Sequence, residues 1–240
     1  MSCDKEGFIE LIRSNIKEFG FHFTIVQQAV EPRFAYTVGC HEVLGFEMIF
    51  AGGIYYLRND LLVIFNKIVD FFKNGGNLQG ELKVDDLGAF KFRRIDDSEK
   101  DAMNLVVIEY VDGINVDVYQ ILPHKDHFTL EIPNMSEKWS FNDSIWKWLK
   151  EKWTFDAPEN SLVVTNLGAL LGKKITEIVR WEIDDWEMFA GAGQETIKKD
   201  IRVVSLGLMI GIDPSLLPSL ELEIEEGIQR DSGETAWRKW

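Results

Sequence analysis

Two stretches predict the fold of the first half of the chain: FAYTVGCHEVLGFEMIFAGG, residues 34–53, and LRNDLLVIFNKIVDFFK, residues 57–73. Residues 34–38 and 47–50 are rich in aromatic and β-branched side chains, which is typical of strands. In residues 57–73 the apolar side chains recur every three or four positions, so they share one face of a helix. Two glycines end that run. This region therefore predicts two strands followed by a long amphipathic helix.

Similar patterns continue on both sides of this region. An apolar stripe from Phe8 to Phe19 predicts a first helix, which Gly20 ends. Residues 22–26 have the composition of a strand, and turn signals at Pro32 separate them from the next one. We expect a β-hairpin or two neighbouring strands here. Further strands are predicted near residues 79–84, 89–95 and 116–122.

Residues 98–111 fit two local structures. Ser98 is a suitable N-cap and is followed by helix-forming residues, whereas Leu105–Ile108 has the composition of a strand. The run is long for a strand, so we predict a helix.

The composition changes between residues 134 and 160, and the turn-rich segment 156–160 marks a domain boundary. We predict one domain over residues 1–155 and a second over 161–240. The predicted fold class is α+β, with two small mixed domains, each a mostly antiparallel sheet packed by a few helices. In the second domain we expect strands at 162–165, 174–181 and 186–189, a strand running into a helix at 203–210, and a helical turn at 215–217.

The 240-residue chain has the balance of an ordinary globular protein, with 45% hydrophobic and 28% charged residues. Its formal net charge of −14 repels nucleic acids and anionic lipid. The charge favours either a basic protein partner or simply good solubility. No apolar run is long enough to cross a bilayer, and the first residues lack the pattern of a signal peptide. We therefore expect no nucleic-acid or membrane partner and a cytoplasmic location.

Two imidazoles and a carboxylate lie close together in His124-Lys125-Asp126-His127. Such a cluster could begin a metal site, but zinc needs three or four ligands. Nothing in the sequence brings Cys40, His41 or His22 near this cluster. The favoured interpretation is a solvated polar loop without metal.

A nucleophile and a base could be supplied by Cys40 and His41. If this segment is extended, adjacent side chains point to opposite faces, so the two groups would not meet. A buried structural cysteine is the favoured interpretation. The sequence also lacks a nucleophile elbow, a P-loop and a dinucleotide-binding motif. We expect no cofactor and a protein that is not an enzyme.

Several polar residues of the first domain lie on predicted strands. A carboxylate, a guanidinium and an amide among them could orient a polar ligand in a pocket. The alternative is a buried polar network that holds the sheet together. The candidate ligand-binding residues are Tyr36, Thr37, Glu47, Arg93 and Gln120.

Two acidic stretches occur in the second domain, at residues 182–185 and 221–226. Both could form a surface for a cationic partner, or they could be ordinary solvated surface. The second stretch alternates charged and apolar residues, which predicts a strand with one wet face. The candidate partner-binding residues are Asp184, Asp185, Trp186, Glu223 and Glu225.

Phe34-Ala35-Tyr36-Thr37-Val38-Gly39 and the later Glu47-Met48-Ile49-Phe50 resemble a bacterial family known as domain of unknown function 4262. The following glycines and helix match the layout of that family, but Phe46 stands where it usually has proline. The resemblance covers roughly residues 15–135. It implies a fold neighbourhood and no particular activity.

The second domain resembles small bacterial domains grouped with immunity-protein-like families. The resemblance implies a non-enzymatic protein that binds and neutralises a toxin, and this is the leading hypothesis. The competing hypotheses are a small-molecule-binding or enzymatic first domain, and a scaffold in a larger assembly. The residues that carry the resemblance are Asp184–Gly191, Val203–Gly207, Ile212–Ser215 and Ala236–Arg238.

Overall fold

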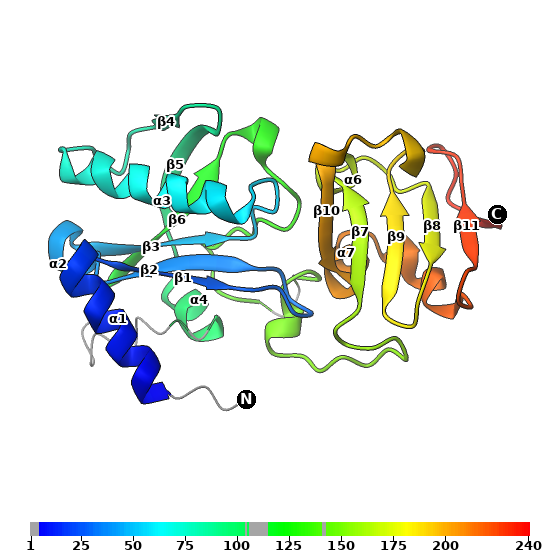
Figure 1. Cartoon of the computed structure of the whole chain (residues 1–240), viewed down its shortest axis with the longest axis horizontal. Helices are drawn as coiled ribbons and strands as arrows, with labels where there is room; N and C mark the ends of the chain where they lie inside the picture. The colour runs from blue at the N-terminus through cyan, green and yellow to red at the C-terminus, as the bar shows by residue number, and fades with distance from the viewer. Residues whose placement is uncertain (1–4, 104, 106–114, 141–142) are drawn as a thin grey trace. The chain divides into compact units, whose positions relative to one another are not determined.

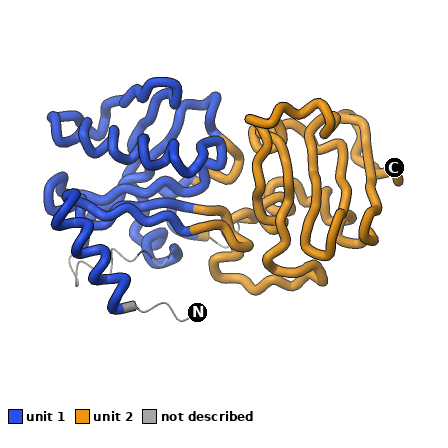
Figure 2. Tube along the Cα trace, viewed as in Figure 1, with its two compact units in different colours: residues 1–26, 34–128, 134–139 blue, residues 27–33, 129–133, 140–240 orange. Residues whose placement is uncertain are grey.

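The computed structural model describes residues 5–103, 105, 115–140 and 143–240. The chain forms two compact units (Figure 2), of which unit 1 comprises residues 1–26, 34–128 and 134–139. Unit 2 comprises residues 27–33, 129–133 and 140–240. The boundary predicted at residues 156–160 therefore lies inside unit 2, and two short upstream segments also join that unit.

Unit 1 is built on a six-stranded sheet with the order β1-β2-β3-β6-β5-β4 (Figure 1). Its pairs are antiparallel except for β3 and β6, which run parallel at the centre. The strands are β1 (His22–Val26), β2 (Phe34–Val38), β3 (Phe46–Ala51), β4 (Leu82–Val84), β5 (Gly88–Arg94) and β6 (Asp117–Pro123).

Helices cover both faces of this sheet. The α3 helix (Arg58–Lys73) lies on one face, where Phe65 contacts Phe23 of β1 and Phe72 contacts Phe46 of β3. The α1 helix (Lys5–Phe19) lies on the other face, where Phe8 contacts His22. The two faces follow from the alternation of side chains along a strand, since His22 and Phe23 are adjacent in β1. The described residues of unit 1 also form α2 (His41–Leu44), α4 (Asp97–Ala102) and the 3₁₀ turn η1 (Lys125–His127).

The long amphipathic helix predicted after residue 56 is confirmed as α3. Its first turn is capped by Asp60, whose carboxylate accepts a hydrogen bond of 2.7 Å from the Leu57 N–H. Its apolar stripe is buried against the sheet, as expected for an amphipathic helix at a sheet face. The buried residues are Leu61, Ile64, Phe65, Ile68, Val69 and Phe72.

Unit 2 is built on a second six-stranded sheet, with the order β10-β7-β9-β8-β11-β12. Only β7 and β9 are parallel among its pairs. The predicted α+β class is thus confirmed, with a mostly antiparallel sheet in each unit. The strands are β7 (Leu162–Asn166), β8 (Glu177–Arg180), β9 (Asp185–Phe189), β10 (Ile201–Ser205), β11 (Gly227–Gln229) and β12 (Arg238–Lys239).

Two of these strands turn directly into short helices. The Asn166 side chain caps α6 (Leu167–Leu170) by accepting from the Ala169 N–H at 3.0 Å. The Ser205 hydroxyl oxygen caps α7 (Leu206–Ile212) in the same way. The predicted strand running into a helix at 203–210 is therefore confirmed. The 3₁₀ helices of unit 2 are η2 (Lys147–Leu149), η3 (Gly193–Glu195), η4 (Lys198–Asp200) and η5 (Pro214–Glu221).

Three local predictions are wrong. The stretch 221–226 is not a strand: Glu221 ends η5, and Glu225 has a φ of 66°, which an extended strand does not allow. The N-cap of α4 is Asp96 rather than Ser98. Residues 106–111 of the predicted helix lie outside the described residues. Cys40 and His41 are not extended, because Gly39, with φ 95°, ends β2 and α2 begins at His41.

No helix within the described ranges is both long enough and apolar enough to span a membrane.

Candidate functional site

A buried carboxylate on β3 lies next to the end of β2. Glu47 of β3 is 1% exposed, and its Oε1 accepts hydrogen bonds from the backbone N–H groups of Gly39 (2.7 Å) and His41 (3.1 Å). Nδ1 of His41 is 2.7 Å from the same oxygen. The Thr37 hydroxyl donates to Oε2 at 2.5 Å and accepts from the Met48 N–H at 2.9 Å. Glu47 therefore ties together the ends of β2, α2 and β3.

This network sets the protonation of its two neighbours. The hydrogen bond to Glu47 raises the pKa of His41, although partial burial acts in the opposite direction. Burial, reinforced by the charge of Glu47, raises the pKa of Cys40 to about 12. Cys40 is only 2% exposed and remains a thiol at neutral pH, so it is not a nucleophile. The prediction of a buried structural cysteine is confirmed.

The five predicted ligand-binding residues do not all meet. Tyr36 and Gln120 occupy one row of the sheet with Ile49 between them, and both side chains are buried. Arg93 pairs with Gln120 in the same row, but its guanidinium is exposed and donates to Asn134 at 3.0 Å. None of the five lines any of the three hollows identified in the described part of unit 1. For Thr37 and Glu47 the geometry is that of a buried network.

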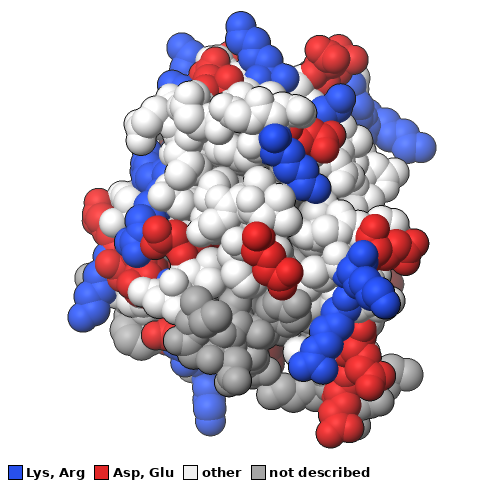
Figure 3. All heavy atoms as spheres, turned by 90° about the vertical axis from the view of Figure 1, so that its left-hand side faces the viewer, with Lys and Arg blue, Asp and Glu red and all other residues white. Residues whose placement is uncertain are grey.

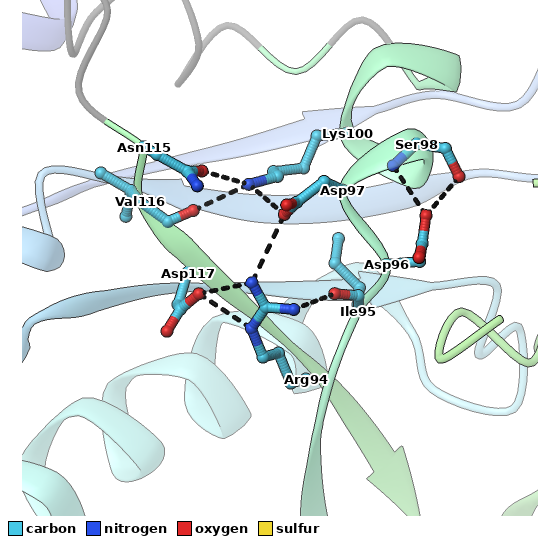
Figure 4. A network of polar contacts seen from close by, with 9 residues as sticks. All are labelled: Arg94, Ile95, Asp96, Asp97, Ser98, Lys100, Asn115, Val116 and Asp117. Atoms are coloured by element: carbon cyan, nitrogen blue, oxygen red, sulfur yellow. Dashed lines mark hydrogen bonds and ion pairs between the residues drawn. The ribbon is translucent and has the colours of Figure 1, made fainter. Parts of the chain in front are cut away.

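A second polar network in unit 1 holds the start of α4 (Figure 4). Arg94 contacts Asp117 at 2.8 Å, and Lys100, which is 7% exposed, contacts Asp97 at 2.7 Å. The Lys100 ammonium also donates to the Val116 carbonyl at 3.0 Å. The two acidic and two basic side chains named here pair with one another, and Asp96 accepts hydrogen bonds from Ser98, so we assign the network to holding α4 in place.

The two histidines predicted as a weak metal candidate have different environments. Nδ1 of His124 is 3.2 Å from a carboxylate oxygen of Asp126. His127 turns away from both and contacts Tyr55 and Tyr56. No group of three or more metal-ligating side chains occurs in the part of the chain that the structure describes. His124 and His127 nevertheless line the same hollow of about 590 Å³.

In unit 2 the two acidic stretches predicted for a partner lie beside each other. The guanidinium of Arg180, at the end of β8, donates to the carbonyls of Ile183 (3.0 Å) and Leu222 (2.8 Å). The backbone N–H of Glu225 donates to the Arg180 carbonyl at 2.7 Å. Arg180 therefore joins segments that are about forty residues apart in the sequence. We call residues 181–185 and 221–226 together the acidic tip.

Most carboxylates of the acidic tip carry no neutralising partner. Its two segments, 181–185 and 221–226, contain three and four acidic residues, respectively, and no lysine or arginine. Within the described residues, Glu226 is the tip residue that forms an ion pair, with Lys239 at 2.7 Å. Arg180 donates to backbone carbonyls, not to carboxylates. The tip therefore carries a net negative charge, which Arg180 and Lys239 offset only in part.

Large apolar side chains are exposed among these carboxylates. Trp181 is 42% exposed, Ile183 60% and Ile224 51%. Exposed tryptophan and isoleucine side chains surrounded by charge are typical of a surface that a partner covers.

The structure corrects one predicted partner-binding residue. Trp186 is fully buried in β9, where Arg180 stacks on its ring at 4.7 Å. A buried indole cannot contact a partner, because that would require β9 to leave the sheet. Asp184 and Asp185 are half-buried, and Glu223 and Glu225 are exposed.

A buried arginine explains several residues of the resemblance in this unit. Arg230 is 3% exposed and contacts Asp213 at 3.0 Å and the Ser215 hydroxyl at 2.8 Å. The ring of Trp237 stacks on its guanidinium at 4.0 Å. Burial opposes ionisation of Asp213, but hydrogen bonds from Ser215 and Arg230 lower its pKa overall. These contacts hold the buried Arg230 side chain in place and give the three partner residues a structural role.

The charged side chains on one face of unit 1 are distributed differently from those of the acidic tip. Figure 3 shows one end of this unit, where lysine, arginine, aspartate and glutamate side chains surround an uncharged area. On this face, neither sign of charge predominates.

Two groups of residues were not found from the sequence. Trp181, Ile183 and Ile224 are apolar residues inside acidic segments, and that pattern could have marked them as exposed anchors. Tyr55 and Tyr56 become relevant only because the fold brings them to His127, and no local pattern predicts that contact.

Comparison with models of protein families, with curated proteins and with solved structures found no match to this chain.

Proposed function

We propose that this chain is a protein-binding protein that captures a basic partner on the acidic tip of unit 2. The observation that carries the proposal is the juxtaposition of two acidic segments by Arg180, with unpaired carboxylates around exposed Trp181, Ile183 and Ile224. The immunity-like resemblance implies that the partner is a bacterial toxin.

Each component of the tip has a separate physical role in this proposal. Negative potential attracts a cationic protein and raises the rate of encounter. Burial of the exposed apolar side chains then supplies affinity, with the indole of Trp181 as the expected anchor. The rigid support is the pair β8 and β9, which hold the tip through Arg180.

The test begins with co-expression of the chain with each basic protein encoded beside its gene. We expect one of them to co-purify and its toxicity to be suppressed. The triple variant Glu182→Gln, Glu223→Gln, Glu225→Gln should weaken that complex about tenfold or more, since up to three charge contacts are lost. Trp181→Ala should weaken it by a similar factor, because a central indole typically contributes about 2 kcal/mol to binding.

A matched control separates the tip from the total charge. Asp156→Asn, Glu159→Gln, Glu195→Gln removes three exposed carboxylates of unit 2 that lie outside the tip. The control should bind the partner as the parent chain does. Equal loss in both triple variants, or full rescue by the tip variant, would contradict the proposal.

A further inference from the structure

Unit 1 contains a hollow of about 590 Å³ that plays no part in the proposed function. It lies at the turn between β4 and β5 and next to η1. Its lining contains two imidazoles and four charged side chains. The lining residues are Glu81, Lys83, Val84, Asp85, Asp86, Gly88, Ala89, His124 and His127.

His127 is fixed in this wall from three directions. Its ring stacks on Tyr55, with 4.0 Å between centroids and an angle of 15°. Its Nδ1 is 2.9 Å from the Tyr56 hydroxyl and 3.2 Å from the Leu87 carbonyl. The ring also packs on Gly88, where a Cβ would be 3.0 Å from two ring atoms. Two segments, residues 55–56 and 87–88, therefore hold one imidazole in place.

The hydrogen bonds determine which ring nitrogen carries the proton. The Tyr56 hydroxyl donates to the Leu87 carbonyl at 2.9 Å, so it has no hydrogen left for His127. A carbonyl is only an acceptor, so the proton near Leu87 and Tyr56 belongs to Nδ1 of His127. In the neutral ring, Nε2 then carries a lone pair. Because Nδ1 contacts Tyr56 and Leu87, Nε2 is the ring nitrogen that remains as an acceptor for a ligand.

The rest of the lining is also dominated by acceptors. Three carboxylates and one ammonium, that of Lys83, leave two net negative charges on the lining. Glu81 is 3.7 Å from Lys91 outside the hollow and is partly offset. Asp85 and Asp86 in the turn have no ion pair among the described residues. They are therefore the carboxylates available to a ligand.

We propose that this hollow binds a small organic ammonium compound, with His127 as the acceptor for an N–H and Asp85 and Asp86 as the counter-charges. A donor-rich cation matches an oriented lone pair and two carboxylates, whereas an anion or a purely acceptor ligand does not. Here, the Nε2 atom has no partner within the described part of the chain.

The test uses the full chain and three four-carbon probes that differ in charge. Putrescine is a dication, butane-1,4-diol is neutral and succinate is a dianion. In long-range ¹H–¹⁵N spectra we expect His127 in the Nδ1–H form. Putrescine should shift its Nε2 signal saturably, and the other two probes should leave it unchanged at the same concentration and ionic strength.

Two double variants test whether Asp85 and Asp86 are the carboxylates that bind the probe. Asp85→Asn, Asp86→Asn keeps the shape of the turn, since asparagine tolerates the positive φ of 58° at position 86. It should weaken putrescine binding about fivefold or more. Glu10→Gln, Glu18→Gln on α1 makes the same change in net charge at exposed positions and should leave binding unchanged.

Four results would overturn the proposal. These are an Nε2–H form of His127, equal shifts with all three probes, equal affinity in both double variants, and saturation by Zn²⁺ alone without any response to putrescine. The last result would identify a metal site instead. Loss of the toxin complex would not affect these outcomes, because the hollow and the acidic tip lie in different units.

Discussion

Glu47 illustrates how a single buried charge constrains the residues around it. An ionised carboxylate is stable inside a protein only when donors compensate for lost water. Two backbone N–H groups, an imidazole and a hydroxyl surround Glu47, and all four of these groups belong to residues 37–41. The chain between β2 and β3 is therefore held around one carboxylate by hydrogen bonds.

Substitution Glu47→Gln should destabilise unit 1 strongly. The amide group places a donor where the carboxylate accepted a hydrogen bond, so at least one buried donor loses its partner. We expect a loss of roughly 3 kcal/mol in the free energy of unfolding. The measurement is urea unfolding followed by amide NMR signals of β2 and β3. The exposed control Glu18→Gln should change this value by less than about 0.5 kcal/mol, and an equal effect would refute the assignment.

His41 should make unit 1 more stable at lower pH. The hydrogen bond to Glu47 raises its pKa above the ordinary 6.5, so the folded state binds the proton more tightly than the unfolded state. The extra stability is fully present below pH 6.5 and is lost as the pH rises through the folded pKa. Compared with His41→Gln, the parent chain should lose stability in urea unfolding as the pH rises above 6.5. Parallel curves for the two proteins would show that the pKa is not raised.

At the scale of elements, α7 shows how close packing overrides helix propensity. Gly207 and Gly211 are both buried in this helix. A Cβ on Gly211 would lie 2.7 Å from the Ser144 carbonyl oxygen and 2.8 Å from the Ile145 Cα, both of which are backbone atoms. Glycine is required here because α7 and the segment at 144–145 approach each other at backbone distance.

Gly211→Ala should therefore destabilise unit 2, although alanine favours a helix by about 1 kcal/mol over glycine. We expect a net loss of about 1–3 kcal/mol from overpacking, measured by urea unfolding with tryptophan fluorescence. Gly233→Ala is the matched control, since no atom lies within 4 Å of its Cβ position and its φ is not positive. A more stable Gly211→Ala protein would mean that the segment at 144–145 can move away.

At the scale of the whole molecule, the net charge of −14 and the local acidic tip act over different distances. The screening length is about 30 Å at 0.01 M salt and about 8 Å at 0.15 M. At low salt a partner senses the whole chain, and at physiological salt it senses only nearby charges.

We therefore expect salt to separate the two triple variants described above. With fluorescent decalysine as a probe, both should bind more weakly than the parent chain at 0.01 M salt, because each has lost three charges. At 0.15 M salt only the tip variant should differ from the parent, by about threefold or more. Fluorescence anisotropy measures the affinity. Equal behaviour at both salt concentrations would assign the attraction to the total charge.

Much of the local structure could be predicted because it depends on local patterns. Period-3.6 repeats locate α1 and α3, and β-branched runs locate β1, β2 and β7. The prediction at 221–226 failed because alternation of charged and apolar residues also occurs in a turn whose apolar side chains are exposed. The five predicted ligand-binding residues do not all lie together, because strand register and not composition determines which of them are neighbours.

The sequence by itself determined the α+β class, the long helix at residues 58–73, the acidity and the burial of Cys40, since propensity, periodicity and charge are properties of neighbouring residues. Only the tertiary structure decided that Arg180 joins two acidic segments and that His127 is held by Tyr55, Tyr56 and Leu87. The long-range contacts among these link residues 40 to 72 positions apart. Packing and hydrogen-bond satisfaction select them across the folded chain, and no local pattern encodes which distant residue will satisfy a given donor.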